Sequence, residues 1–368
     1  MTTRTNSTEQ AAGALFAGKR ILVTGGTGSI GQALVRRLLT ADSGSGERAA
    51  KVVMFSRDEE KQQQMRAEFA ATPLAAPACP DFRLGDIRDP ASVAQVLRDV
   101  DIVFNAAAMK QVPTGEYFPY EAVRTNVTGA ENIVRAIQEH DLPVEAVVGI
   151  STDKACKPVS AMGMSKALQE RIFIQANLRH PQTRFACVRC GNVLNSRGSV
   201  VPFFRQQIRA GGPVTVTSRD MTRFLFSIDD AVNAILAAAE NALPGETYIP
   251  RGPSAKVMDI AKALIGARPI ETKITGIRPG EKLHEILLGE EESARTLERT
   301  HCGSAYYVIR PMLPELPVAA ESLSLLGKEY SSADAVMTFA ETEQFLRAHA
   351  SLLESVGVQH AGPHLGKT

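Results

Sequence analysis

Short apolar runs separated by longer mixed stretches dominate the first half of the chain. The runs occur at 21–23, 51–55, 101–108 and 146–150, and residues 121–138 repeat apolar side chains at helical spacing. Strands that alternate with helices in this way predict an α/β fold with a doubly wound parallel sheet. In such a fold, ligands bind at the carboxyl ends of the strands.

The first apolar run leads into a glycine-rich turn and then into a helical pattern. Strand, glycine turn and helix follow one another in the order of a Rossmann dinucleotide-binding unit. Glycines let the backbone approach a pyrophosphate closely, and the helix N-terminus adds free N–H groups and the positive end of its dipole. We therefore predict cofactor contacts from Gly25, Thr27, Gly28, Ser29, Ile30 and Gly31.

The second strand ends in serine and arginine, where an NAD enzyme usually presents an acidic residue to the ribose. A guanidinium can bind a 2′-phosphate with several charge-assisted hydrogen bonds, which favours NADP over NAD. The predicted contacts are Ser56, Arg57, Asp58 and Lys61. In the alternative interpretation, Arg57 caps the following helix or pairs with Glu59 or Glu60.

Two later strand ends complete the predicted cofactor site. Asp86 follows a strand and is a candidate contact for the adenine edge, with Ile87 beside it. Ala106 and Ala107 end another strand, and their small side chains would let the backbone lie along the cofactor.

Composition narrows the classes of partner. The chain has 368 residues and a formal net charge of +1, so no long-range field favours nucleic acid or an acidic membrane. No apolar run reaches the roughly 18 residues of a membrane span, and the first 18 residues lack a signal-peptide pattern, so we expect a cytoplasmic protein. Five cysteines, an odd number, argue against a disulfide framework. Cys187 and Cys190 have CxxC spacing but lack a second Cys/His pair, so no metal site is expected.

Several longer motifs resemble those of the UDP-N-acetylglucosamine 4,6-dehydratases, which are extended short-chain dehydrogenases/reductases. The motifs include FSRDEEKQQQMR, STDKACKPVSAMGMSK, RCGNVLNSRGSVVPFF and GIRPGEKLHE. The resemblance covers residues 19–349 and is strongest to the inverting branch without membrane spans. Met162 stands where short-chain enzymes usually carry tyrosine, but some active members of this family also have methionine there.

The resemblance implies a domain organisation and an assembly state. We expect a flexible segment at 1–18, an NADP-binding Rossmann domain at 19–190, and a flexible tail at 350–368. Residues 191–349 would form mainly a smaller substrate-binding lobe, with some segments returning to the Rossmann domain. The polar stretches 41–50 and 71–80 are predicted to be mobile loops. The family also implies a homo-oligomer, with a hexamer as one candidate.

The implied reaction is an internal redox elimination on a UDP-sugar. Carbon 4 of the sugar is oxidised, water is eliminated across carbons 5 and 6, and the hydride returns to carbon 6. NADP would stay tightly bound and be regenerated each cycle. The product would be a UDP-2-acetamido-2,6-dideoxy-4-hexulose inverted at carbon 5.

The acid–base residues follow from the same resemblance. Lys154 is the expected base at carbon 5 and must lose its proton, while Asp153 is the expected acid at carbon 6 and must hold one. Lys166 would hold the nicotinamide ribose, and Thr152 would polarise the carbonyl. Met162 has no titrating proton, so an ordered water or Asp153 would accept the 4-hydroxyl proton. The alternative role of Met162 is helix packing alone. In the alternative interpretation, Asp153 and Lys154 form a salt-bridged surface turn.

The UDP-sugar itself needs local cations and polar groups, because the net charge supplies no field. Guanidinium groups suit phosphate oxygens. The positions that match the family motifs are Lys110, Asn192, Arg197, Arg223, Arg278 and Glu281. Cys190 departs from a tyrosine that is common in the family, which affects a detail of the pocket wall.

Two other functions compete with the dehydratase. A UDP-hexosamine 4-epimerase would share the ketone intermediate but would need no base at carbon 5. A non-catalytic NADP-binding regulator or scaffold would have no need for Asp153, Lys154 and Lys166 together.

Overall fold

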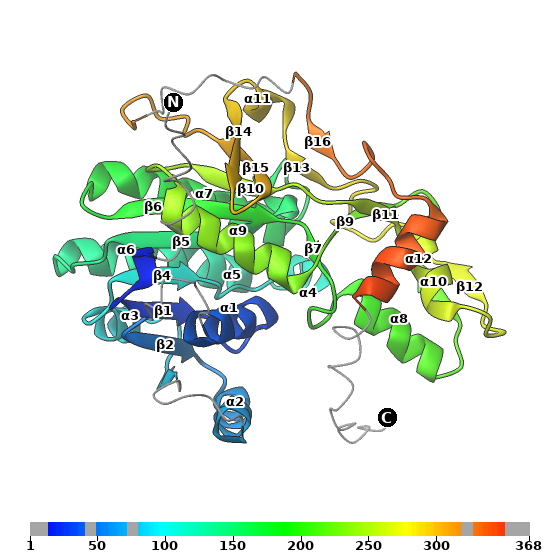
Figure 1. Ribbon diagram of the computed structural model, residues 1–368, viewed down its shortest axis with the longest axis horizontal. Coiled ribbons are helices and arrows are strands. Elements are labelled where there is room, and N and C mark those ends of the chain that lie inside the picture. Colours follow the sequence, from blue (N-terminus) through cyan, green and yellow to red (C-terminus); the bar gives the residue numbers. More distant parts are fainter. Residues whose placement is uncertain (1–13, 41–48, 72–79, 318–326, 350–368) are drawn as a thin grey trace, which may run out of the picture.

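A nine-stranded sheet forms the centre of the computed structural model (Figure 1), which describes residues 14–40, 49–71, 80–317 and 327–349. The strand order is β14-β15-β10-β6-β5-β4-β1-β2-β3. The strands in chain order are β1 (Arg20–Thr24), β2 (Lys51–Ser56), β3 (Asp81–Leu84), β4 (Ile102–Asn105), β5 (Ala146–Thr152), β6 (Arg184–Cys190), β10 (Thr247–Pro250), β14 (Thr296–His301) and β15 (Ser304–Ile309). Most of the predicted loops at 41–50 and 71–80, the segment 1–13 and the tail 350–368 lie outside the described residues.

The predicted parallel, doubly wound sheet is confirmed for the strands from β3 to β10, which pair in parallel with their neighbours. At the other edge, β10 pairs antiparallel with β15, and β15 pairs antiparallel with β14. This antiparallel edge was not predicted, because its strands come from the second half of the chain. The result is a mixed sheet in which β5 is the middle strand and β1 lies between β4 and β2.

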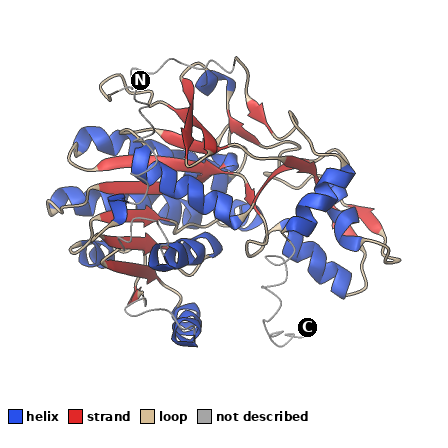
Figure 2. Ribbon diagram, in the orientation of Figure 1, coloured by secondary structure: helices blue, strands red, loops and turns tan. Residues whose placement is uncertain are grey.

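Helices cover both faces of this sheet (Figure 2). One face packs against α1 (Ser29–Thr40), α2 (Glu59–Ala71) and α9 (Ile228–Asn241). The other face packs against α3 (Pro90–Leu97), α6 (Gly129–Glu139) and α7 (Ala161–Arg179). Alternate residues of β1 show the reason: Ile21 and Val23 enter one core, and Leu22 enters the other. A strand that is buried on both faces needs a continuous apolar run.

Short helices connect these layers. The first is a 3₁₀ turn at Ala14–Phe16, and α4 (Val112–Tyr117) follows β4. The helix predicted over 121–138 is built from three pieces, α5 (Pro119–Ala122), a π-helical stretch at Val123–Thr128, and α6.

A smaller body of short strands and helices lies beside the sheet, to the right in Figure 1. Its strands are β7 (Asn192–Val193), β8 (Val214–Val216), β9 (Thr222–Phe226), β11 (Ser254–Lys256) and β12 (Thr272–Ile274). A separate antiparallel pair, β13 (Ile286–Leu288) and β16 (Tyr330–Ser331), packs Leu287 and Leu288 in one core with Ile249 and Ile309 of the large sheet. Whereas α11 (Glu290–Ser293) lies above β14 in Figure 1, the helices of the smaller body include α8 (Val200–Arg209), α10 (Val257–Ile265) and α12 (Phe339–Ala348). Side chains such as Phe204, Ile260 and Leu346 form a separate apolar core there.

Within the described part of the chain, no helix combines the length and apolar character needed to cross a membrane. The chain segments α9, β10, β14 and β15 lie in or on the first sheet although they follow residue 191 in sequence. The boundary at residue 190 between the Rossmann domain and the substrate-binding lobe stays a prediction.

Candidate active site

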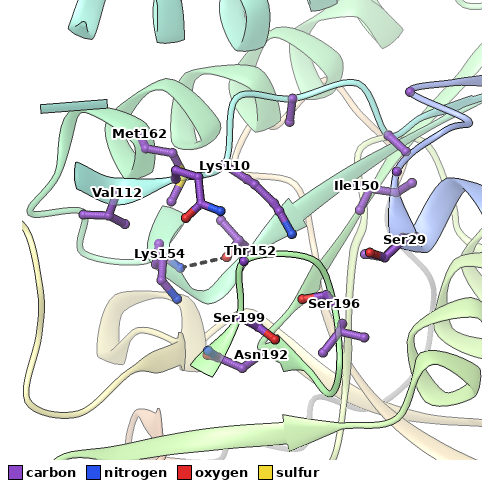
Figure 3. Close-up of a pocket in the computed structure, with 18 of the residues that line it drawn as sticks. Ser29, Lys110, Val112, Ile150, Thr152, Lys154, Met162, Asn192, Ser196 and Ser199 are labelled. Atoms are coloured by element: carbon purple, nitrogen blue, oxygen red, sulfur yellow. Dashed lines mark hydrogen bonds between the residues drawn. The ribbon is translucent and has the colours of Figure 1, made fainter. Parts of the chain in front are cut away.

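A cavity of about 850 Å³ extends from the glycine turn, along the carboxyl ends of the sheet strands, to the loops of the smaller body. Figure 3 shows part of it, with Lys110, Thr152 and Lys154 near one another and Asn192 and Ser199 on the segment after β6. Parallel strands bring their carboxyl ends to one edge, so β5 and β6 end side by side, with Thr152 opposite Cys190. This is the position at which open α/β sheets bind ligands.

The glycine turn between β1 and α1 forms one end of the cavity. Gly25 has a φ of +65°, and a Cβ added there would lie 2.6 Å from the backbone nitrogen of Ala107. At Gly31, an added Cβ would lie 2.5 Å from the carbonyl oxygen of Gly25, so the helix could not pack on the turn. Every residue that we predicted in this turn lines the cavity. The turn therefore fits a dinucleotide, whose pyrophosphate needs close backbone approach at a helix N-terminus.

The end of β2 forms the neighbouring wall. Ser56, Arg57, Asp58 and Lys61 all line the cavity. Lys61 pairs with Asp58, and the Arg57 guanidinium lies 3.7 Å from Asp86 while 62% of the Arg57 side chain stays exposed. The ion-pair partner of Arg57 is thus Asp86 rather than Glu59 or Glu60. Arg57 is an accessible cation at the rim of the cofactor end.

The two later strand ends also reach this end of the cavity. Asp86, Ile87, Ala106 and Ala107 line it. The Asp86 carboxylate accepts hydrogen bonds from Arg88, at 2.6 Å from Nη2, so it is already engaged in ion pairs. The backbone N–H of Ala107 donates to the Thr24 hydroxyl at 3.2 Å, which fixes β4 against the glycine turn.

The predicted acid–base pair lies where β5 ends. Thr152 caps a 3₁₀ turn at Asp153–Ala155, and its hydroxyl donates to Asp153 Oδ1 at 2.8 Å. Lys154 Nζ donates to the same oxygen at 3.0 Å. Thr152 and Lys154 line the cavity, but Asp153 is fully buried and does not. Its second oxygen, Oδ2, is buried and has no hydrogen-bond partner among the described residues.

A second carboxylate faces Lys154, and the sequence analysis did not identify it. Glu285 Oε1 lies 3.3 Å from Lys154 Nζ, and the Glu285 side chain is only 2% exposed. Burial lowers the pKa of Lys154, but the negative charges of Asp153 and Glu285 outweigh it, so the net shift is upward. The expected base therefore lies in an environment that holds its proton, contrary to the lowered pKa that its role suggested. Glu285 ends the GIRPGEKLHE motif, so the motif itself was an available signal.

Helix α7 brings two more predicted residues to the cavity. Met162 and Lys166 are one turn apart, and both line it. Lys166 Nζ donates to the carbonyl of Ile150 at 2.5 Å and to Gln169 Oε1 at 2.6 Å. Burial lowers the pKa of Lys166 to about 8. A Cβ added to Gly163 would lie 2.3 Å from the carbonyl oxygen of Lys154, so this glycine lets α7 approach the 3₁₀ turn at Asp153–Ala155.

Five of the six predicted substrate contacts line the cavity, and four of them are considered first: Lys110, Asn192, Arg278 and Glu281. Asn192 Oδ1 is buried with no hydrogen-bond partner in the described structure. The Ser199 hydroxyl, which we did not predict, is in the same state and also lines the cavity. Both atoms are therefore placed to bond a ligand.

The other two predicted substrate contacts are engaged elsewhere. Arg223 lines the cavity, but its guanidinium donates to the carbonyls of Thr222 at 2.7 Å and Lys282 at 3.1 Å. Arg197 does not line the cavity; its Nη1 donates to the Thr27 carbonyl at 3.2 Å, at the glycine turn. Backbone carbonyls thus accept hydrogen bonds from two of the three predicted arginines, and Arg197 lies outside the cavity lining.

The fold and the site define a class before any relative is considered. A parallel sheet with a glycine turn after β1, a lysine on α7 and a smaller body over the cavity are the features of an extended short-chain dehydrogenase/reductase that binds a nicotinamide cofactor. A family model described as "Polysaccharide biosynthesis protein" matches residues 21–307. The chain belongs to this family.

Individual relatives carry two different names. The chain is 40% identical over 319 residues to a UDP-N-acetylglucosamine 4,6-dehydratase (inverting) of Campylobacter jejuni, covering 86% of this chain and 90% of the relative. It is 42% identical over 285 residues to a UDP-glucose 4-epimerase of Rickettsia massiliae, covering 76% of this chain and 81% of the relative. The family resemblance predicted from the motifs is thus confirmed.

Solved structures agree on the fold. Pen from Bacillus thuringiensis superposes with a TM-score of 0.81 at 30% identity, over 91% of this chain and 99% of that one. DesIV, a dTDP-glucose 4,6-dehydratase from Streptomyces venezuelae with NAD and TYD bound, has a TM-score of 0.65 at 21% identity, over 92% and 99% of the two chains. At that identity, the second likeness concerns the fold alone.

Proposed function

We propose that this chain is a UDP-N-acetylglucosamine 4,6-dehydratase that uses NADP and inverts carbon 5 of the sugar. The observation that carries the proposal is Lys154 at the cavity wall, with its Nζ 3.0 Å from Asp153 Oδ1. A 4-epimerase needs neither a base at carbon 5 nor an acid at carbon 6. The Campylobacter jejuni relative supports the choice of substrate and the inversion.

The cofactor end of the cavity fits a nicotinamide dinucleotide. In this proposal the glycine turn holds the pyrophosphate, Ser56 and Arg57 bind the 2′-phosphate, and Lys166 holds the nicotinamide ribose. A nicotinamide bound there supplies reversible hydride transfer, from carbon 4 of the sugar and back to carbon 6. NADP over NAD rests on Arg57, an accessible cation where NAD enzymes have an acidic side chain.

In this proposal, Lys154, Asp153 and Thr152 carry out the proton transfers. Once carbon 4 is a ketone, the proton on carbon 5 is acidic because its anion is an enolate, and neutral Lys154 removes it. Asp153 supplies the proton with which the carbon 6 hydroxyl leaves as water. Since Asp153 is covered, we propose that the Thr152 hydroxyl, which bonds Oδ1 at 2.8 Å and lines the cavity, carries that proton to the sugar. The net change is the loss of one water.

The substrate end provides polar groups for the rest of the UDP-sugar. We assign the diphosphate to Arg278, which is exposed in the cavity, and the uridine ribose to Glu281. Lys110 would contact the sugar. Asn192 Oδ1 and the Ser199 hydroxyl, which lack partners among the described residues, would bond sugar substituents.

The test is incubation of the purified protein with UDP-N-acetylglucosamine in heavy water, followed by proton NMR and mass spectrometry. We expect a 4-keto-6-deoxy product with one deuterium at carbon 5, and coupling constants that report inversion. UDP-N-acetylgalactosamine as the sole product would instead establish the epimerase. Bound NADP without turnover of any UDP-hexose would favour the regulator.

Self-association is also part of the proposal. Tyr117 and Tyr120, on α4 and α5, are 83% and 72% exposed, and Met164 and Leu168 on the adjoining α7 are each 51% exposed. Large apolar side chains on packed neighbouring helices would be covered by a second copy of the chain. Light scattering after size-exclusion chromatography would measure the oligomer, and a monomer at all concentrations would refute it.

A further inference from the structure

Four charged side chains meet at the sugar end of the cavity, and they come from three separate segments. Lys154 and Asp153 follow β5, Arg223 lies on β9, and Glu285 precedes β13. Glu285 Oε1 lies 3.3 Å from Lys154 Nζ and 3.6 Å from Arg223 Nε. Asp153, Glu285 and Arg223 are each less than 10% exposed, whereas the Lys154 side chain keeps 24% exposure toward the cavity. The group contains two negative and two positive charges.

The backbone around Glu285 is anchored from both sides. Its N–H donates to the Ser332 hydroxyl at 2.9 Å, and its carbonyl accepts from the Ser332 N–H at 2.8 Å. Arg223 donates to the carbonyls of Lys282 and Leu283, which holds the rest of the loop. Glu285 Oε2 is nevertheless buried with no hydrogen-bond partner among the described residues, although Glu285 lines the cavity. A buried carboxylate on so firmly held a backbone, which faces Lys154 and Arg223 and leaves one oxygen without a hydrogen bond, is poorly explained as packing alone.

We propose that Glu285 is a positioning residue that acts through Lys154: it fixes Nζ at the cavity wall and stabilises the ammonium that forms when Lys154 takes the carbon 5 proton. This inference rests on the proposed function. In that step, Lys154 changes from neutral to positive while the sugar becomes an enolate. A fixed negative charge beside the forming cation favours the transition state, because it is already oriented before the step begins.

The same group offers a route to a neutral Lys154, although Asp153 and Glu285 raise its pKa and favour the charged form. A proton that moves from Lys154 Nζ to Asp153 Oδ1, 3.0 Å away, leaves a neutral amine and a neutral carboxyl, and the Glu285–Arg223 ion pair remains. The total charge does not change, and no oxidant or reductant is needed. This transfer prepares both the base for carbon 5 and the acid for carbon 6. Arg223 would thereby serve the proton chemistry rather than the diphosphate.

Two charge-changing variants test the role of Glu285, because they should shift the pH at which Lys154 loses its proton in opposite directions. The charged and titratable groups around Lys154 are Asp153 on its own turn, Arg223 on β9, and Glu285 and Lys282 on the following loop, with Cys190 of β6 near Asp153. Glu285→Gln removes a negative charge, so Lys154 should lose its proton at lower pH. Arg223→Gln removes a positive charge, so Lys154 should lose its proton at higher pH.

The readout is the rate of deuterium entry at carbon 5 as a function of pH. For Glu285→Gln we expect the rising limb to move to lower pH and the plateau to fall by about 10- to 100-fold, with little change in KM. Arg223→Gln should move the limb to higher pH, and Glu285→Asp should restore most of the original limb. Glu298→Gln, the same change at a surface ion pair on β14, is the matched control and should change nothing.

Two outcomes would overturn the proposal. One is a Glu285→Gln rate that falls equally at every pH with the limb unmoved; the other is an Arg223→Gln limb that moves to lower pH. If Glu285→Gln does not fold, the direction in which Arg223→Gln moves the limb still decides the sign of the charge effect. Competitive acetylation of Lys154, followed by peptide mass spectrometry across pH, measures its protonation without turnover. It therefore tests Glu285 even if UDP-N-acetylglucosamine is not the substrate.

Discussion

The two ends of the cavity are built in different ways. The cofactor end is made mainly of backbone from one continuous segment, residues 24–31, and from strand ends that the parallel sheet brings into line. The sugar end is made of side chains from segments far apart in sequence, among them Lys154, Arg223 and Glu285. The first end depends on the absence of side chains, and the second depends on the balance of their charges.

This difference sets how each end responds to change. At the glycine turn, any side chain occupies space that the chain or a ligand needs. At the sugar end, removing one ion leaves its partners buried without a counter-charge, which costs more than the pair contributes when complete. Mutations at the cofactor end should therefore alter binding, and mutations at the sugar end should alter catalysis and its pH dependence.

The largest effect is expected at the sugar end, from Lys154→Met. This change keeps most of the side-chain volume but removes the amine, so deuterium entry at carbon 5 should fall by on the order of 10³-fold. Cofactor affinity, measured by fluorescence titration, should stay within a few-fold of the original. Lys157→Met is the matched control, because Lys157 is exposed and pairs with Glu329 at 2.6 Å. Comparable loss in both variants would contradict a catalytic role.

At the cofactor end, we expect Gly25→Ala to weaken cofactor binding. A left-handed backbone costs an L-residue about 1–2 kcal/mol, and the added Cβ would also overlap Ala107. We expect cofactor affinity to fall by on the order of 100-fold, measured by calorimetry. Gly303→Ala is the control, since Gly303 has a φ of +75° and open space around its Cβ position. It should lose some stability but no affinity; equal losses of affinity would mean that the turn does not contact the cofactor.

The same contrast explains what the sequence could predict. The glycine turn and its neighbouring strand ends are local patterns, and every residue predicted there lines the cavity. Arg223 was predicted to contact the UDP-sugar because it matches a family motif, but the sequence did not show that its guanidinium donates to the carbonyls of Thr222 and Lys282. Glu285 was in a recognised motif, but its importance depends on facing Lys154, which is more than a hundred residues earlier. Long-range pairing, as in β14 and β15, is likewise not encoded in a local pattern.

The smallest effect is expected at the rim of the cofactor end, from Arg57→Ser. The Arg57 side chain is 62% exposed, so solvent screens its charge, and an exposed ion pair contributes about 1 kcal/mol at most.

We therefore expect NADP affinity to fall by about two- to fivefold at low salt, while NAD affinity stays unchanged. The difference between the two cofactors should shrink as ionic strength rises, because salt screens exposed charges more than buried ones. Arg83→Ser, at an arginine that is 55% exposed and pairs with Asp81, controls for the loss of a surface charge. Equal weakening of both cofactors by Arg57→Ser would mean that Arg57 supports the shape of the cofactor end without distinguishing NADP from NAD, and the preference would then have to come from Ser56 or Lys61.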